Sequence, residues 1–159
     1  MAWNPSPAGQ QKLQEIVARY PNRMAACLPA LRIAQEELGW VSPDAMAWVS
    51  QALDLPIAHV QGVVSFYTLY HRKPVGKHVV QVCRTLSCAL RGSERVLDQC
   101  KKKLGVEVGG TTADGKVTLE TAECLASCGT APVLTVDDEF YENLSAEAVD
   151  QLLDRLRSE

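Results

Sequence analysis

Four of the six cysteines in the chain form two closely spaced pairs, Cys83 with Cys88 and Cys124 with Cys128. Four thiolates that converge can bind a zinc ion or an iron–sulfur cluster. Each pair follows a strand-like apolar run, at residues 78–82 and 117–120. If these two strands lie side by side in one sheet, both cysteine segments emerge at the same edge. The sequence therefore predicts that the four sulfurs form one site.

The spacing of the pairs narrows the choice of metal without settling it. Neither Cys-x4-Cys nor Cys-x3-Cys is the two-residue knuckle common in structural zinc sites. A plant-type ferredoxin would need a third cysteine soon after the first pair, and a Rieske centre would need two histidine ligands. The chain has no such third cysteine, and none of its histidines lies in either cysteine segment. The spacing favours a [2Fe–2S] cluster and leaves zinc as the alternative.

Two further cysteines, Cys27 and Cys100, fall on apolar faces of predicted helices. A free cysteine in such a position behaves as a small hydrophobic residue, so we expect both to pack in the core. The N-terminus has no basic start followed by an apolar run, and no apolar stretch reaches the roughly 20 residues of a membrane span. We expect a cytoplasmic protein without direct membrane insertion, in which thiols stay reduced and disulfides are the less favoured interpretation.

Composition and missing motifs argue against two other classes of function, nucleic-acid binding and nucleotide-coenzyme binding. The 159 residues are 47% hydrophobic and 22% charged, as in a soluble globular protein with one or two cores. A net charge of −3 argues against a broad nucleic-acid-binding surface. The sequence has no Gly-x-Gly-x-x-Gly and no phosphate loop, which argues against a nucleotide-coenzyme pocket in this chain.

The spacing of apolar residues changes midway along the chain, from one typical of helices to one that includes strands. The first part predicts a small bundle of four helices, near residues 8–20, 24–38, 43–53 and 56–67. The third of these helices has a strong start signal in Ser42-Pro43-Asp44. A polar connection follows at residues 71–77, and we place the boundary there, between a helical domain at 1–72 and a second domain at 73–159.

The second domain predicts an α/β arrangement. Strands are expected at 78–82, 117–120, 132–136 and 140–141, with one helix after Gly92-Ser93-Glu94 that ends before Gly105 and another after Ser145. This order predicts an open sheet covered by helices, so the chain as a whole is α+β.

Several motifs resemble a known family. They are Cys83-x4-Cys88 with Leu90-Arg91-Gly92-Ser93, the run Glu123-Cys124-Leu125-Ala126-Ser127-Cys128-Gly129-Thr130-Ala131-Pro132-Val133, and His59-Val60-Gln61-Gly62-Val63-Val64-Ser65-Phe66-Tyr67 in the helical half. Together they resemble the small thioredoxin-like [2Fe–2S] subunit of NADH:quinone oxidoreductase, over nearly the whole chain. The family often has glycine where Ala126 stands, a departure that we expect to leave ligation undisturbed.

The resemblance implies a fold, a cofactor and partners. The second domain would be thioredoxin-like, with one [2Fe–2S] cluster bound by Cys83, Cys88, Cys124 and Cys128. The chain would have no catalytic residues and would transfer single electrons to or from a flavin. FMN and NADH would bind a partner flavoprotein subunit, docked on the helical domain together with other peripheral-arm subunits, at the inner face of the membrane.

Three alternatives stay open. Related subunits serve NAD-linked hydrogenases and formate dehydrogenases, so the parent complex is not decided. A zinc-binding interaction module belongs to another class of protein, and a solitary redox sensor would keep the cluster without partners. Among the charges beside the pairs, Glu120 and Glu123 would lower a cluster potential, whereas Arg84 and Arg91 would raise it or anchor a partner. All four can equally be solvated surface charges.

Overall fold

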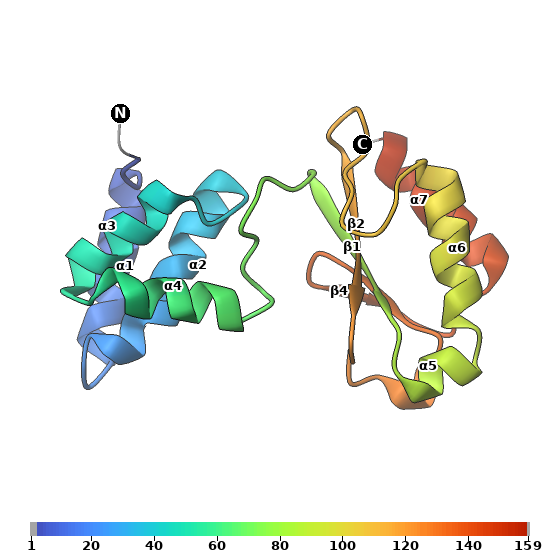
Figure 1. Ribbon diagram of the computed structural model, residues 1–159, viewed down its shortest axis with the longest axis horizontal. Coiled ribbons are helices and arrows are strands. Elements are labelled where there is room, and N and C mark those ends of the chain that lie inside the picture. Colours follow the sequence, from blue (N-terminus) through green and yellow to red (C-terminus); the bar gives the residue numbers. More distant parts are fainter. Residues whose placement is uncertain (1–2, 159) are drawn as a thin grey trace. The chain divides into compact units, whose positions relative to one another are not determined.

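The computed structural model describes residues 3–158 and divides the chain into two compact units, one up to Pro74 and the other from Val75 onward (Figure 1). The first unit is helical, and the second contains the whole sheet. This arrangement confirms the α+β class predicted from the sequence.

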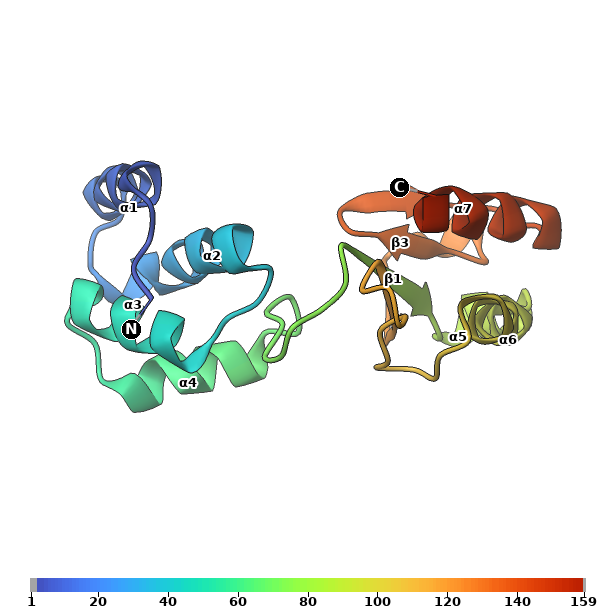
Figure 2. The same cartoon turned by 90° about the horizontal axis from the view of Figure 1, so that it is seen from above.

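The first unit is built from four α-helices and one short 3-10 helix (Figures 1 and 2). Their bounds are α1 Pro7–Arg19, η1 Met24–Ala26, α2 Cys27–Leu38, α3 Pro43–Leu53 and α4 Ile57–Phe66.

Local sequence sets where these helices begin and end. The Ser42 hydroxyl accepts a hydrogen bond of 3.1 Å from the Ala45 N–H at the start of α3, as its cap signal predicts. Gly39 ends α2 with a left-handed φ of +76°, a conformation that glycine adopts without steric cost. Cys27 is buried in the core of this unit, as predicted, among Leu31, Val49 and other apolar side chains.

The second unit contains a four-stranded sheet in the order β2-β1-β3-β4. The strands are β1 His78–Cys83, β2 Val117–Ala122, β3 Leu134–Val136 and β4 Glu139–Tyr141. β1 runs parallel to β2 and antiparallel to β3, and β3 is antiparallel to β4. The prediction that the strands before the two cysteine pairs lie side by side is therefore confirmed.

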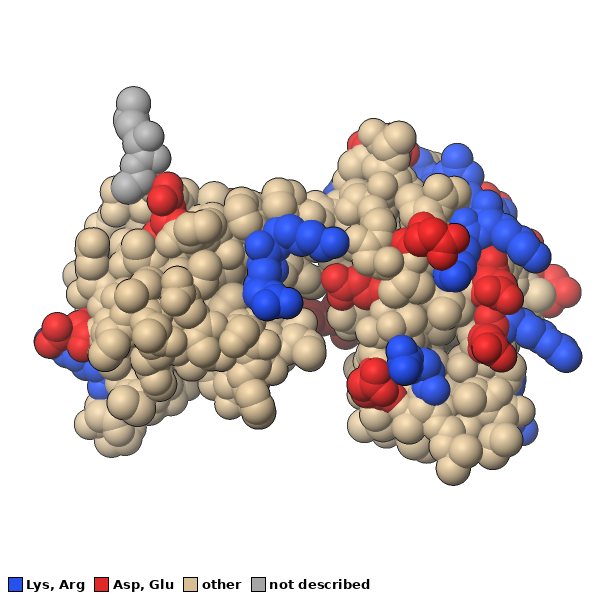
Figure 3. All heavy atoms as spheres, in the orientation of Figure 1, with Lys and Arg blue, Asp and Glu red and all other residues tan. Residues whose placement is uncertain are grey.

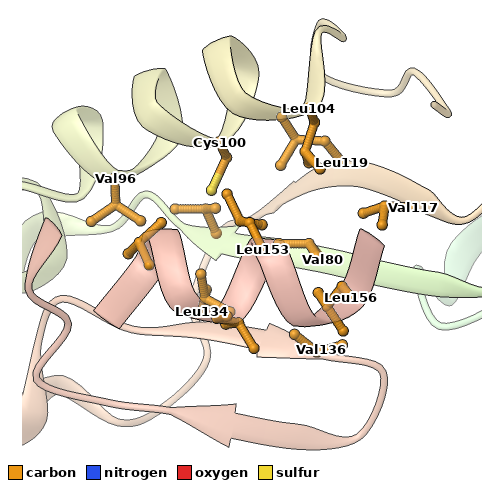
Figure 4. Packing of buried hydrophobic residues seen from close by; sticks show 13 residues of the cluster. Val80, Val96, Cys100, Leu104, Val117, Leu119, Leu134, Val136, Leu153 and Leu156 are labelled. Carbon is orange, nitrogen blue, oxygen red and sulfur yellow. The ribbon is translucent and has the colours of Figure 1, made fainter. Parts of the chain in front are cut away.

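Two long helices, α6 Ser93–Leu104 and α7 Ala146–Ser158, cover one face of this sheet (Figures 1 and 2). Figure 4 shows Cys100 of α6 and Leu153 of α7 meeting Val80 of β1 in the core between the layers. Both Cys100 and Leu153 are fully buried. Two shorter helices, α5 Leu86–Leu90 and the 3-10 helix η2 Cys128–Thr130, lie outside this core.

Within residues 3–158, no helix has both the length and the apolar character that crossing a membrane requires.

Candidate metal centre

The parallel pairing of β1 and β2 delivers both cysteine pairs to one edge of the sheet. Cys83 is the last residue of β1, and its register partner in β2 is Ala122. The Arg84 N–H continues the ladder by donating a 3.0 Å hydrogen bond to the Ala122 carbonyl. Cys124 follows just beyond this point, so the two cysteine segments leave the sheet together.

A five-residue helix, α5, places Cys88 beside Cys83. The helix begins after Thr85, and the first of its hydrogen bonds joins the Ala89 N–H to the Thr85 carbonyl at 2.8 Å. Cys83 and Cys88 are only 3% and 2% exposed, and they share a small apolar cluster with Ala131 and Val133. Sequence reasoning missed α5 because so short a segment shows no helical periodicity.

The second cysteine pair is exposed to solvent, in contrast to the first. Cys128 opens η2, which lies beside α5. Cys124 lies in the connection between β2 and η2, where the Ala126 N–H donates a 3.3 Å hydrogen bond to its Sγ atom. The site thus has one buried pair and one exposed pair of thiols.

The electrostatics of the thiols show that the two cysteine segments interact. Burial acts to raise the pKa of Cys83, but hydrogen bonds to its sulfur, from the backbone N–H groups of Thr85 and Leu125 among others, lower that pKa overall. The Leu125 N–H belongs to the second segment. Burial raises the pKa of Cys88, and the neighbouring Cys83 and the charge of Cys128 raise it further.

The hydrogen-bond donors around the cysteine sulfurs suit a metal cofactor that is bound through thiolates. Thiolates are the ligands of iron–sulfur clusters and of structural zinc, and backbone N–H groups directed at sulfur stabilise its negative charge. Among residues 3–158, no three or more His, Cys, Asp or Glu side chains are grouped so that they could hold a metal ion. A [2Fe–2S] core distributes its four cysteine ligands over two irons.

Three of the four charges that the sequence placed beside the pairs contact neighbouring side chains. Arg84 and Glu123, both strongly exposed, form an ion pair of 3.5 Å. Glu120 accepts a 3.0 Å hydrogen bond from the Gln81 side chain.

Sequence reasoning missed Glu142, which contacts the second cysteine segment. Its Oε1 atom accepts hydrogen bonds from the hydroxyls of Ser127 and, at 2.6 Å, Thr130. Glu142 follows β4 and lies 15 residues after Ser127 and 12 after Thr130, so no local spacing signals this contact.

Comparisons with known proteins agree with this geometry. The family model described as "Thioredoxin-like [2Fe-2S] ferredoxin" matches residues 13–157. A relative from Mycobacterium tuberculosis (strain H37Rv), named as a subunit of NADH-quinone oxidoreductase, is 42% identical over 146 residues, covering 92% of this chain and 58% of the relative. A relative from Rhizobium meliloti, also named as an NADH-quinone oxidoreductase subunit, is 40% identical over 149 residues, covering 94% of this chain and 89% of the relative. The chain thus spans little more than half the length of the mycobacterial relative.

Among solved structures, the fold resembles part of an NAD+-reducing [NiFe]-hydrogenase in the air-oxidised state. The match has a TM-score of 0.71 at 18% identity and covers 81% of this chain and 23% of that chain. At this identity the likeness concerns the fold alone. The family match, the relatives and the paired thiols lead to one conclusion: the chain belongs to the thioredoxin-like [2Fe–2S] ferredoxin family, and its cofactor is one [2Fe–2S] cluster.

Proposed function

We propose that this chain is an electron-transfer subunit of an NADH:quinone oxidoreductase, with Cys83, Cys88, Cys124 and Cys128 as the ligands of its cluster. The observation that carries the proposal is the delivery of both cysteine pairs to one sheet edge by β1 and β2. Relatives about 40% identical over nearly the whole chain are named as subunits of that oxidoreductase.

The residues around the sulfurs fit this role. A [2Fe–2S] cluster gains or loses one electron, and its potential depends on charge, on hydrogen bonds to sulfur and on solvent exposure. Buried Cys83 and Cys88 would anchor the group within the apolar cluster, and exposed Cys124 and Cys128 would face solvent or a partner. The N–H groups of Leu125 and Ala126 donate to sulfur and would stabilise thiolate charge.

The hydride chemistry would take place on another subunit. The sequence has no glycine-rich dinucleotide or phosphate loop. We therefore assign NADH and FMN to a flavoprotein partner, and to this chain the exchange of single electrons with the flavin.

The helical unit offers a surface for such a partner. Residues 55–71, which include α4, contain no Asp, Glu, Lys or Arg. Phe66 and Leu69 are 78% and 65% exposed there. Figure 3 shows that much of the visible face of this unit carries neither acidic nor basic side chains. Exposed apolar patches of this kind mark protein–protein contacts, so we assign docking of the flavoprotein and other peripheral-arm subunits to the helical unit.

We further propose that the chain works in the cytoplasm, at the inner face of the membrane through its complex. All six cysteines are free thiols in the structure, and the cytoplasm keeps thiols reduced.

The first test is the metal content of the protein. Anaerobic purification should give a brown-red protein with about two irons and two acid-labile sulfides per chain, bleached by dithionite. A colourless protein with zinc in place of iron would contradict the proposal.

The second test is the partner. The tagged chain should co-purify with an FMN-containing subunit, and Phe66→Asp with Leu69→Asp should abolish this capture while the iron content is retained. Co-purification with hydrogenase or formate dehydrogenase subunits would reassign the parent complex, and isolation of a cluster-bearing chain alone would contradict docking.

A further inference from the structure

The second cysteine segment is fastened to the chain that follows β4. The Glu142 carboxylate accepts hydrogen bonds from the Ser127 and Thr130 hydroxyls, which also lie 2.8 Å from each other. The Asn143 N–H donates to the Thr130 carbonyl at 2.7 Å, and the Leu144 N–H donates to the Pro132 carbonyl at 3.2 Å. We call residues 142–144 the clasp, because they hold residues 127–132 through side chain and backbone.

The clasp brackets Cys128. Ser127 directly precedes this cysteine, and Thr130 closes the short helix η2 that Cys128 opens. Cys128 is exposed, whereas Cys83 and Cys88 are held by apolar packing. Hydrogen bonds to Glu142 thus restrain the exposed segment around Cys128, as apolar packing restrains Cys83 and Cys88.

Glu142 also places a negative charge beside the segment that contains Cys128. Hydrogen bonds from the Ser127 and Thr130 hydroxyls hold the pKa of Glu142 below its usual range, so the group is ionised at neutral pH. Both of these donors are neutral. Glu123, in contrast, faces the guanidinium of Arg84 at 3.5 Å, which offsets its charge.

We propose that Glu142 positions Cys128 and lowers the reduction potential of the cluster. Gaining an electron makes the site more negative by one charge, and a carboxylate linked to the residue beside Cys128 opposes that gain. The inference rests on the proposed function, because it takes Cys128 as a ligand. Glu142 is a positioning residue in this role, and it acts through Ser127 and Thr130.

Two substitutions at Glu142 separate its charge from its hydrogen bonds. Glu142→Gln keeps an oxygen acceptor for the hydroxyls and removes the charge, whereas Glu142→Ala removes both. Ser127→Ala keeps the charge and removes one hydroxyl. Asp98→Asn is the matched control, because Asp98 is an exposed carboxylate of α6 whose charge acts on Lys101.

The experiment measures the midpoint potential by EPR-monitored redox titration, and the rate of cluster loss to a chelator, on the full-length chain. Glu142→Gln should raise the potential at wild-type cluster content, and the shift should shrink in high salt, because exposed charges are screened. Glu142→Ala should raise the potential and lose the cluster several-fold faster. Ser127→Ala should lose the cluster faster at a potential close to wild type, and Asp98→Asn should match wild type in both measurements.

The outcomes distinguish this inference from the proposed function. A Glu142→Gln protein with full cluster content and an unchanged potential would overturn the charge role. Wild-type cluster retention in Glu142→Ala and Ser127→Ala would overturn the positioning role. A wild-type protein without iron or sulfide would instead overturn the proposed function itself.

Discussion

The backbone N–H of Ala126 lies 3.3 Å from the Sγ atom of Cys124, and Ala126 makes this contact with a left-handed φ of +58°. A side chain with a Cβ atom adopts that conformation at a cost of about 1–2 kcal/mol. Glycine does so with no steric cost, which gives a physical reason for the glycine that the family often has at this place. The chain thus accepts local strain where a backbone donor reaches a candidate ligand.

Replacing Ala126 by glycine should relieve this strain. We expect Ala126→Gly to raise the free energy of unfolding by about 0.5–1 kcal/mol, since part of the relief is offset by the greater freedom of glycine in the unfolded chain. Ala148→Gly, in the exposed first turn of α7, should lower the unfolding free energy by about 0.5–1 kcal/mol. Chemical denaturation of both variants checks the opposite signs, and a destabilised Ala126→Gly protein would contradict the strain.

The ligand set predicts different spectra for two cysteine variants. Cys124→Ala should abolish or severely weaken the visible iron–sulfur absorption, because it removes a proposed ligand. Cys100→Ala should leave that absorption intact, because Cys100 is fully buried in the core between α6, α7 and the sheet (Figure 4). Absorption spectra and iron content after parallel reconstitution provide the measurement. Equal loss in both variants would refute the assignment.

Alkaline pH should remove a stabilising contribution of Cys100. Burial raises the pKa of its thiol from 9.0 to about 12. Below pH 9 the thiol is protonated in both the folded and the unfolded chain, so the contribution is fully present. Between pH 9 and 12 the unfolded chain releases the proton and the folded chain does not, so stability falls as pH rises.

The measurement compares wild type with Cys100→Ala and Cys100→Ser, all carrying the cluster, by urea denaturation at pH 8 and pH 10.5. The stability advantage of wild type over each variant should shrink by about 1–2 kcal/mol at the higher pH. Neither alanine nor serine ionises in this range, so the two variants should agree. An advantage that is independent of pH would show that Cys100 ionises as readily in the folded chain.

The helical unit contains a partly buried hydrogen bond whose loss should be measurable. The Tyr70 hydroxyl donates to the Leu28 carbonyl at 2.8 Å, joining the segment after α4 to α2. Tyr70→Phe should lower the free energy of unfolding by about 0.5–1.5 kcal/mol, because the hydrogen bond between the Tyr70 hydroxyl and the Leu28 carbonyl is lost. Tyr67→Phe is the control, because Tyr67 is 39% exposed, and it should change stability by less than about 0.5 kcal/mol. Equal effects of the two substitutions would contradict the assigned role of Tyr70.

Signals within a few residues of each other allowed much of the fold to be predicted from the sequence. Ser42 caps α3 and Ser145 caps α7, as the sequence indicates. Gly39 and Gly105 end α2 and α6 in left-handed conformations that glycine adopts readily. The strand before each cysteine pair was also correctly placed, so the meeting of the two segments at one edge follows from the parallel pairing of β1 with β2.

By itself, the sequence determined the donor chemistry of this protein: which cysteines form pairs, which strands precede them and which two thiols lie in cores. Only the tertiary structure decided that the first pair is buried and the second exposed, that Ala126 is left-handed, and that Glu142 holds the segment around Cys128. The reason is physical. Caps and periodicity depend on neighbours along the chain, whereas burial and the contacts of Glu142 arise when segments distant in sequence pack together.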